Sequence, residues 1–201
     1  MKKLPIGVQS IEKILSENEY AYVDKTGLIK KLIDEGAPHY FMSRPRRFGK
    51  SLFINTLEEL FKGNKELFKE CEIYKSDYSW EKHHVLHFDF AQISSSSCED
   101  FKSGLKAEIE RMGELHEISV TEGPSVKFQL KVLIENLSKK NQVVVLVDEY
   151  DSAIINNLKN LDLVEKNRDI LKDFFEALKS LDRYLKFTFV TGVSKFSQVS
   201  L

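Results

Sequence analysis

The most constraining feature of the sequence is a basic, glycine-containing stretch that joins an apolar segment to an amphipathic one. The stretch reads Arg44-Pro45-Arg46-Arg47-Phe48-Gly49-Lys50-Ser51, and it follows the apolar residues 40–42. After it, apolar side chains recur at helical spacing across residues 52–61. A strand, a loop that ends in Gly-Lys-Ser, and a helix form the arrangement of a phosphate-binding P-loop.

The chemistry of these residues explains why the pattern suits a polyphosphate. The first backbone N–H groups of a helix lack partners inside the helix and carry the positive end of its dipole, so phosphate oxygens can accept from them. Gly49 would let the backbone approach the phosphate, Lys50 would place a charge on the outer phosphates, and the Ser51 hydroxyl would coordinate Mg²⁺. The predicted nucleotide-binding residues are Arg46, Arg47, Phe48, Gly49, Lys50, Ser51 and Leu52.

The start of the loop departs from the common P-loop pattern, G-x-x-x-x-G-K-[ST]. Arg44 occupies the first glycine position, and Pro45 lacks an N–H group and favours an extended backbone at the residue before it. The loop therefore cannot begin with the usual tight glycine turn. Arg46 and Arg47 could compensate through their side-chain charge, or they could belong to a solvated basic loop. Since Gly-Lys-Ser alone occurs by chance in many chains, the prediction depends on a second motif downstream.

That second motif is an aliphatic run that ends in two acids. Residues 143–147 are five consecutive aliphatic residues, which predicts a central strand buried on both faces. Asp148 and Glu149 follow directly, and two acids at the end of such a strand are costly unless they leave the core or do chemistry. This is the Walker B pattern, in which Asp148 would hold Mg²⁺ and Glu149 would act catalytically on the attacking water. Together the two motifs predict a P-loop nucleotide-binding fold.

Five segments carry a resemblance to the bacterial AAA-ATPase-like family. Around the P-loop, residues 41–52 resemble the signature of this family, and Arg44 in place of the first glycine is itself a habit of its members. The other segments are Ile6-Gly7-Val8-Gln9-Ser10, Tyr22-Val23-Asp24-Lys25-Thr26, Asp148-Glu149-Tyr150-Asp151 and Thr191-Gly192-Val193-Ser194-Lys195-Phe196-Ser197. The resemblance covers nearly the whole chain, and it implies ATP as the nucleotide.

The same resemblance implies features beyond the residues present. Members are usually longer and resemble proteins with a C-terminal restriction-endonuclease-like domain, which we do not expect within these 201 residues. The P-loop ATPases that this chain resembles also have a fifth strand beside the first and then a helical lid, both expected past Leu201. We therefore expect a fragment of a longer product or a chain that relies on self-association or a partner protein. No arginine finger can be assigned in this chain, and a partner subunit would normally supply it.

Composition limits the classes of partner and compartment. Lys and Arg number 30 against 31 Asp and Glu, a net charge of -1, so the chain has no global basic field for nucleic acid. Nucleic-acid handling is therefore implied only by analogy with the family. Cys71 and Cys98 lie far apart and suggest neither a disulfide framework nor a zinc site, which fits a cytoplasmic location. No apolar run reaches the length of a signal peptide or a membrane span, so we expect no membrane partner.

The remaining pattern predicts an α/β fold with three layers, αβα, and a parallel sheet. Strands are expected at about 39–43, 85–90, 143–147 and 187–191, with helices between them. The expected helices cover residues 10–17, a segment before Gly36, and about 50–62, 65–71, 101–112, 126–137, 152–158 and 164–181. Residues 1–38 would be a helical lead-in packed on the core, and residues 39–201 the P-loop ATPase core. Tyr22 and Val23 are candidate base contacts or packing residues.

The carboxyl ends of parallel strands form the rim where ligands bind, which adds candidates to the site. Thr191 or Ser194, after the fourth strand, would hydrogen-bond the γ-phosphate or the attacking water, unless they form an ordinary turn; we name Ser194 with Glu149 and Lys50 as catalytic. Asp151 would support the metal or, in the interpretation we favour, cap the next helix. His83, His84, His87 and Asp89 have the spacing of a strand and its approach, and we interpret them as strand-end polar residues rather than a metal cluster.

Two functions follow from these predictions. The first is Mg²⁺-dependent ATP hydrolysis coupled to a conformational change, with Ser51 and Asp148 as the metal ligands. The alternative is a nucleotide-dependent interaction module that does not hydrolyse, or a truncated piece of a larger ATPase-nuclease protein.

Overall fold

The computed structural model describes residues 2–17, 19–120 and 123–194. Its centre is a four-stranded sheet with the order β1-β4-β3-β2, and all neighbouring strands run parallel. The strands are β1 (His39–Ser43), β2 (Val85–Asp89), β3 (Val143–Asp148) and β4 (Leu185–Gly192). The predicted parallel α/β sheet is thus confirmed.

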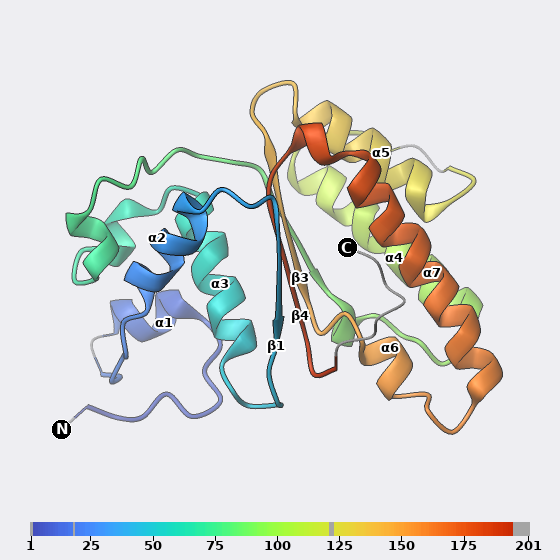
Figure 1. Ribbon diagram of the computed structural model, residues 1–201, viewed down its shortest axis with the longest axis horizontal. Helices are drawn as coiled ribbons and strands as arrows, with labels where there is room; N and C mark the ends of the chain where they lie inside the picture. The colour runs from blue at the N-terminus through green and yellow to red at the C-terminus, as the bar shows by residue number, and fades with distance from the viewer. Residues whose placement is uncertain (1, 18, 121–122, 195–201) are drawn as a thin grey trace.

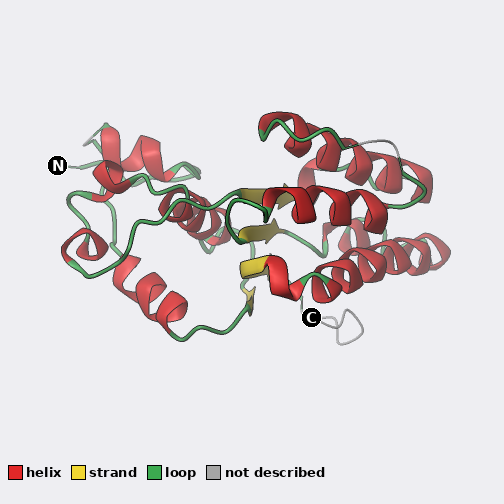
Figure 2. Cartoon of the chain, turned by 90° about the horizontal axis from the view of Figure 1, so that it is seen from above, coloured by secondary structure: helices red, strands yellow, loops and turns green. Residues whose placement is uncertain are grey.

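Helices cover both faces of this sheet (Figure 1). One face carries α1 (Ile11–Ser16), α2 (Thr26–Asp34) and α3 (Lys50–Phe61), and the other carries α4 (Cys98–Leu115), α5 (Val126–Leu137), α6 (Ser152–Ile155) and α7 (Leu161–Ser180). Short 3-10 helices are η1 (Lys65–Phe68), η2 (Glu72–Lys75), η3 (Phe90–Gln92) and η4 (Asp182–Tyr184). Figure 2 shows the strands as a narrow band between the two groups of helices, as the three-layer prediction requires.

Strand β3 lies inside the sheet, between β4 and β2, and every one of its side chains is buried. Successive side chains of a strand point to opposite faces, so β3 contributes to two separate apolar cores. Val143, Val145 and Val147 pack with α4, α5 and α7, whereas Val144 and Leu146 pack with the helices of the other face. The strand therefore needs aliphatic residues at consecutive positions, which is why the sequence predicts a strand that is buried on both faces.

Helix starts are set by polar side chains that accept hydrogen bonds from the first turn. Ser97 Oγ accepts from the Asp100 amide (3.0 Å) at the start of α4. Asn160 Oδ1 accepts from the Leu163 amide (3.2 Å), and α7 consequently begins at Leu161, before the expected start at residue 164. Within the described residues, no helix combines the length and the apolar character needed to cross a membrane.

The expected helix at 65–71 is wrong in kind, because the segment forms η1 and then η2. Two side chains at the start of α2 provide the physical reason. Asp24 Oδ2 accepts from the Glu72 amide (2.7 Å) and Thr26 Oγ1 accepts from the Ile73 amide (3.2 Å). These long-range bonds replace helical ones, so the segment follows α2 instead of continuing as one helix. The boundary between a lead-in (1–38) and a core (39–201) stays a prediction.

Candidate nucleotide-binding site

The candidate site lies where β1, β3 and β4 end. The loop with the Gly-Lys-Ser motif leaves β1 after Ser43 and leads into α3, whose first residue is Lys50. Asp148 ends β3, and Gly192 ends β4. Since the strands are parallel, all three ends share one edge of the sheet, the edge at which α/β proteins bind ligands.

The backbone of the P-loop turns through left-handed conformations before the helix starts. Arg47 has φ 66° and Gly49 has φ 77°. A Cβ added at Gly49 would meet nothing within 4 Å, so glycine is needed there for its backbone conformation and not for space. Gly49 occupies the N-cap position and brings no side-chain cap, which leaves the first amides of α3 available to an anion.

Lys50 is held against the start of its own loop. Its side chain is 4% exposed, and Nζ donates to the carbonyl oxygens of Arg44 (3.1 Å) and Pro45 (3.3 Å). Pro45 cannot donate an N–H group to a phosphate, but its carbonyl is an acceptor for the ammonium group. The unusual Arg-Pro start of the loop therefore supplies two hydrogen-bond acceptors for the Lys50 ammonium group.

A buried hydrogen-bond cluster fixes the acidic pair. The Thr191 hydroxyl donates to Asp148 Oδ1, and the Glu149 amide approaches both Asp148 Oδ1 (3.0 Å) and Thr191 Oγ1 (3.3 Å). Glu149 has φ 47°, a conformation that is uncommon for a non-glycine residue and often found at functional sites. Of the two residues considered at the end of the fourth strand, Thr191 is thus the one that is hydrogen-bonded to the acidic pair.

Burial raises the pKa of Glu149, and the neighbouring Asp148 carboxylate raises it further, while Lys50 acts in the opposite direction. A carboxyl group with a raised pKa is a better proton acceptor than an ordinary glutamate. Asp89 ends β2 opposite Asp148 in the register, and burial followed by the charge of Asp148 raises its pKa too. The sequence pattern predicts Asp89 at a strand end but gives it no part in the site.

A cavity of about 800 Å³ joins several of the predicted residues. That volume lies within the range of about 300–1,000 Å³ that is usual for ligand pockets. Its lining consists of Pro5, Ile6, Gly7, Val8, Gln9, Arg46, Arg47, Gly49, Lys50, Ser51, Leu52 and Glu149. Of the predicted nucleotide-binding residues only Phe48 is outside this set, and its side chain is 66% exposed. The cavity therefore places the P-loop next to the catalytic candidate Glu149.

Residues 5–9 are the part of the lining that sequence reasoning missed. Residues 6–9 belong to a motif of the family resemblance, but the sequence offers only Tyr22 and Val23 as base contacts or, alternatively, as packing residues. The structure places neither Tyr22 nor Val23 in the lining: Tyr22 packs against the core beside α3, and Val23 is 76% exposed. Ile6, by contrast, lines the cavity with a side chain that is 87% exposed.

Asp151 occupies the N-cap position of α6, as expected, but its side chain makes no capping hydrogen bond there, so the capping role we favoured is wrong. Its Oδ2 instead accepts from the amides of Val193 (2.9 Å) and Ser194 (2.7 Å). The Ser194 carbonyl accepts from the Tyr150 hydroxyl (3.0 Å), and Ser194 lies outside the residues that line the cavity. Asp151 thus fixes the backbone after β4.

The donor set at the rim fits a magnesium ion. Mg²⁺ prefers oxygen ligands and is usually held by one or two protein groups together with water and substrate phosphates. Ser51 offers a hydroxyl in the lining of the cavity, and Asp148, which does not line it, offers a carboxylate beside Glu149; both are oxygen donors of this kind. The described part of the chain contains no group of three or more His, Cys, Asp or Glu side chains placed to hold a metal. Any ion would therefore depend on the nucleotide for much of its coordination.

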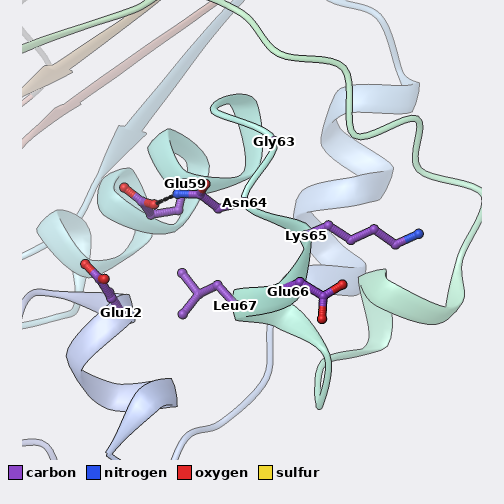
Figure 3. A pocket seen from close by; sticks show the side chains of 7 residues that line it. All are labelled: Glu12, Glu59, Gly63, Asn64, Lys65, Glu66 and Leu67. Atoms are coloured by element: carbon purple, nitrogen blue, oxygen red, sulfur yellow. Dashed lines mark hydrogen bonds between the residues drawn. The ribbon is translucent and has the colours of Figure 1, made fainter.

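A second, smaller cavity of about 390 Å³ lies between α1 and the end of α3 (Figure 3). It contains none of the predicted site residues. Figure 3 shows Asn64 turned towards Glu59, with which it is hydrogen-bonded, while Lys65 and Glu66 point away from them. Its carboxylates do not converge, and it offers no arrangement comparable with the P-loop rim.

A parallel α/β sheet with Gly-Lys-Ser at the start of one helix and an acidic pair at the end of a central strand defines the class of P-loop nucleotide-binding proteins. The family model described as "Predicted AAA-ATPase" matches residues 5–201. The chain therefore belongs to the AAA-ATPase-like family, as the sequence motifs indicated.

One relative is an "Uncharacterized protein in vnfD 5'region" from Azotobacter chroococcum mcd 1. It is 39% identical over 202 residues, a match that covers 100% of this chain and 39% of the relative. The chain thus spans well under half the length of that relative.

Proposed function

We propose that this chain is an ATP-binding domain that hydrolyses ATP with Mg²⁺ and changes conformation with its nucleotide state. The observation that carries the proposal is the shared cavity: Lys50 and Ser51, at the start of α3, line the same space as Glu149. The family supports a nucleotide as the ligand. The preference for ATP follows the family name.

In this proposal the P-loop holds the phosphates. The free amides at the start of α3 and the Lys50 ammonium group bind phosphate oxygens, and Arg46 and Arg47 add positive charge at the cavity wall. Lys50 exchanges the carbonyls of Arg44 and Pro45 for the phosphate when it binds. Residues 5–9 line the remaining part of the cavity and contact the base or ribose.

The acidic pair performs the chemistry in this proposal. Glu149 orients the attacking water and accepts its proton, for which a raised pKa is suited. Asp148 and Ser51 would hold Mg²⁺, which when bound neutralises charge on the phosphates. Thr191 keeps the Asp148 carboxylate in one orientation through its hydroxyl group. Ser194 stays the second candidate for contact with the γ-phosphate.

Two substitutions test the proposal when nucleotide binding and phosphate release are measured with and without Mg²⁺. Lys50→Ala should weaken ATP binding by about 100-fold or more, since it removes a charge-assisted contact of about 3 kcal/mol. Glu149→Gln should keep binding but lose at least about 100-fold in turnover, so that bound ATP accumulates. The exposed residues Lys131 and Glu176 provide matched controls as Lys131→Ala and Glu176→Gln.

Unchanged ATP affinity in Lys50→Ala would overturn the binding assignment. Binding by the unsubstituted chain without phosphate release would replace hydrolysis by the alternative, a nucleotide-dependent interaction module. In that case Glu149→Gln would leave the complex unchanged.

A further inference from the structure

The backbone at the end of β4 lies between the P-loop and the turn that carries the acidic pair. We call residues 192–194, which are the last residue of β4 and the two that follow it, the post-β4 segment. On one side it is bonded to the start of the P-loop: the Arg44 amide donates to the Gly192 carbonyl (3.1 Å), and the Ser43 hydroxyl donates to the Val193 carbonyl (2.9 Å). The segment therefore holds the residues from which the P-loop begins.

On its other side the post-β4 segment is bonded to the two residues that follow the acidic pair. Asp151 Oδ2 accepts from two consecutive amides of the segment, and the Tyr150 hydroxyl donates to the carbonyl of Ser194. The Tyr150 amide also donates to the Thr191 carbonyl (3.0 Å). One short piece of backbone thus contacts both the P-loop and the turn that carries Glu149.

Burial of the Asp151 carboxylate is unfavourable unless the carboxylate makes hydrogen bonds. The Asp151 side chain is only 1% exposed. Its side chain makes no capping hydrogen bond to α6 and does not line the cavity. Its carboxylate instead accepts from the amides of Val193 and Ser194. Hydrogen bonds from amides to a carboxylate are charge-assisted, so they are stronger than bonds between neutral groups.

Gly192 shows how closely the segment approaches. A Cβ added there would lie 2.5 Å from Tyr150 Cε1 and 3.0 Å from Asp151 Oδ1. Such contacts are too short, so any larger residue would push the segment away from Tyr150 and Asp151. The close approach gives a second way to loosen the segment while the Asp151 carboxylate is kept.

We propose that Asp151 is a positioning residue that acts through the post-β4 segment and keeps the P-loop in register with the acidic pair. This inference rests on the proposed function and adds a coupling element to it. The Arg44 amide is held by Gly192, and the Arg44 carbonyl is an acceptor for Lys50 Nζ. A displaced segment therefore shifts the residue against which Lys50 rests. A misplacement of about 1 Å can lower a catalytic rate by about 100-fold.

The experiment combines hydrogen exchange with ATP binding and turnover. In Asp151→Ala, the amides of Val193, Ser194 and Arg44 should exchange at least about 10-fold faster than in the unsubstituted chain, without nucleotide. ATP affinity should change by less than about 3-fold, whereas turnover should fall by about 10- to 100-fold. Asp151→Asn, whose side-chain oxygen can accept from the same amides, should restore most of the protection and turnover.

Two further variants keep the test decisive. Gly192→Ala should reproduce the loss of turnover and protection by displacing the segment, even if Asp151→Ala fails to fold. Asp162→Ala is the matched control, because Asp162 is an exposed carboxylate paired with Lys166 one turn away. It should behave as the unsubstituted chain does.

The results separate this inference from the proposed function. If Val193 and Ser194 exchange faster in Asp151→Ala while the Arg44 amide keeps its protection, the segment does not connect the P-loop to the acidic pair and the inference is wrong. Normal turnover in a loosened variant would also overturn it. If the unsubstituted chain binds no ATP, the proposed function fails, yet Arg44 exchange in Asp151→Ala still decides whether the segment couples the P-loop to Asp151.

Discussion

Strand β4 carries two buried threonines that differ in one respect, and together they test the hydrogen-bond cluster at the acidic pair. Thr191 Oγ1 bonds to Asp148, whereas Thr188 Oγ1, three residues earlier, has no hydrogen-bond partner within the described residues. Both side chains are fully buried. Replacing each by valine removes a hydroxyl at nearly constant shape, so the two variants differ mainly in what that hydroxyl contacts.

The expected difference follows from the partner that is left behind. Thr191→Val leaves a buried carboxylate with one donor fewer, and a hydrogen bond to a charged group contributes about 1.5–3 kcal/mol. We therefore expect a loss of about 2 kcal/mol in the free energy of unfolding, or about 4–8 °C in Tm for a chain of this size. Thr188→Val removes an unpaired buried hydroxyl, so it should be neutral or stabilising by up to about 1 kcal/mol.

Urea unfolding of the three proteins at neutral pH measures this difference, provided that the m-values agree. If the chain hydrolyses ATP as proposed, the turnover of Thr191→Val should be lower than that of Thr188→Val. Free energies of unfolding that agree within about 0.5 kcal/mol between the two valine variants would refute the assignment of the Thr191 hydroxyl to Asp148.

Two further predictions concern stability. Burial alone would raise the pKa of Glu58, but the hydrogen bonds from His87 and Lys62 outweigh it and lower the pKa to about 2. The ionised Glu58 therefore stabilises the fold above pH 4.5 by up to about 3 kcal/mol, and this contribution is lost as the pH falls from 4.5 to about 2. In urea titrations, the free energies of unfolding of Glu58→Gln and of the unsubstituted chain should converge as the pH falls through that window. Phe174 is fully buried, and its ring centroid lies 5.2–5.4 Å from those of three other phenylalanines. Phe174→Ala should therefore lower the free energy of unfolding by about 3–5 kcal/mol, whereas Phe128→Ala, at an exposed position, should lower it by less than about 1 kcal/mol. Equal losses in the two variants would contradict the position of the core.

The sheet and the main motifs could be predicted because their signals are local. Residues 143–147 must be aliphatic throughout, since alternate side chains enter two different cores. Gly49 must adopt a left-handed backbone before α3, which selects glycine directly before Lys50. In both cases the pattern and the structural demand lie within the same few residues.

The rest of the site depends on contacts between residues far apart in the chain. Residues 5–9 reach the cavity only because the lead-in packs beside α3, where the Ile11 amide donates to Asn55 Oδ1 (2.7 Å). The partners of Asp151 lie 42 and 43 residues away, so nothing near it in the sequence distinguishes a helix cap from an anchor for another strand. The hydrogen bond between Thr191 and Asp148 likewise joins residues that lie 43 positions apart.

The contact of Lys50 with the start of the P-loop also has a consequence for the energetics of ligand capture. A lysine side chain that swings freely in solvent loses about 1.5–2 kcal/mol of rotamer entropy when it is immobilised. Here that ordering has already occurred on folding, because the ammonium group rests on two carbonyl oxygens of Arg44 and Pro45. Binding of an anion would exchange these two hydrogen bonds for new ones, so the free energy of association is spared the ordering of a flexible side chain but includes the loss of those two bonds.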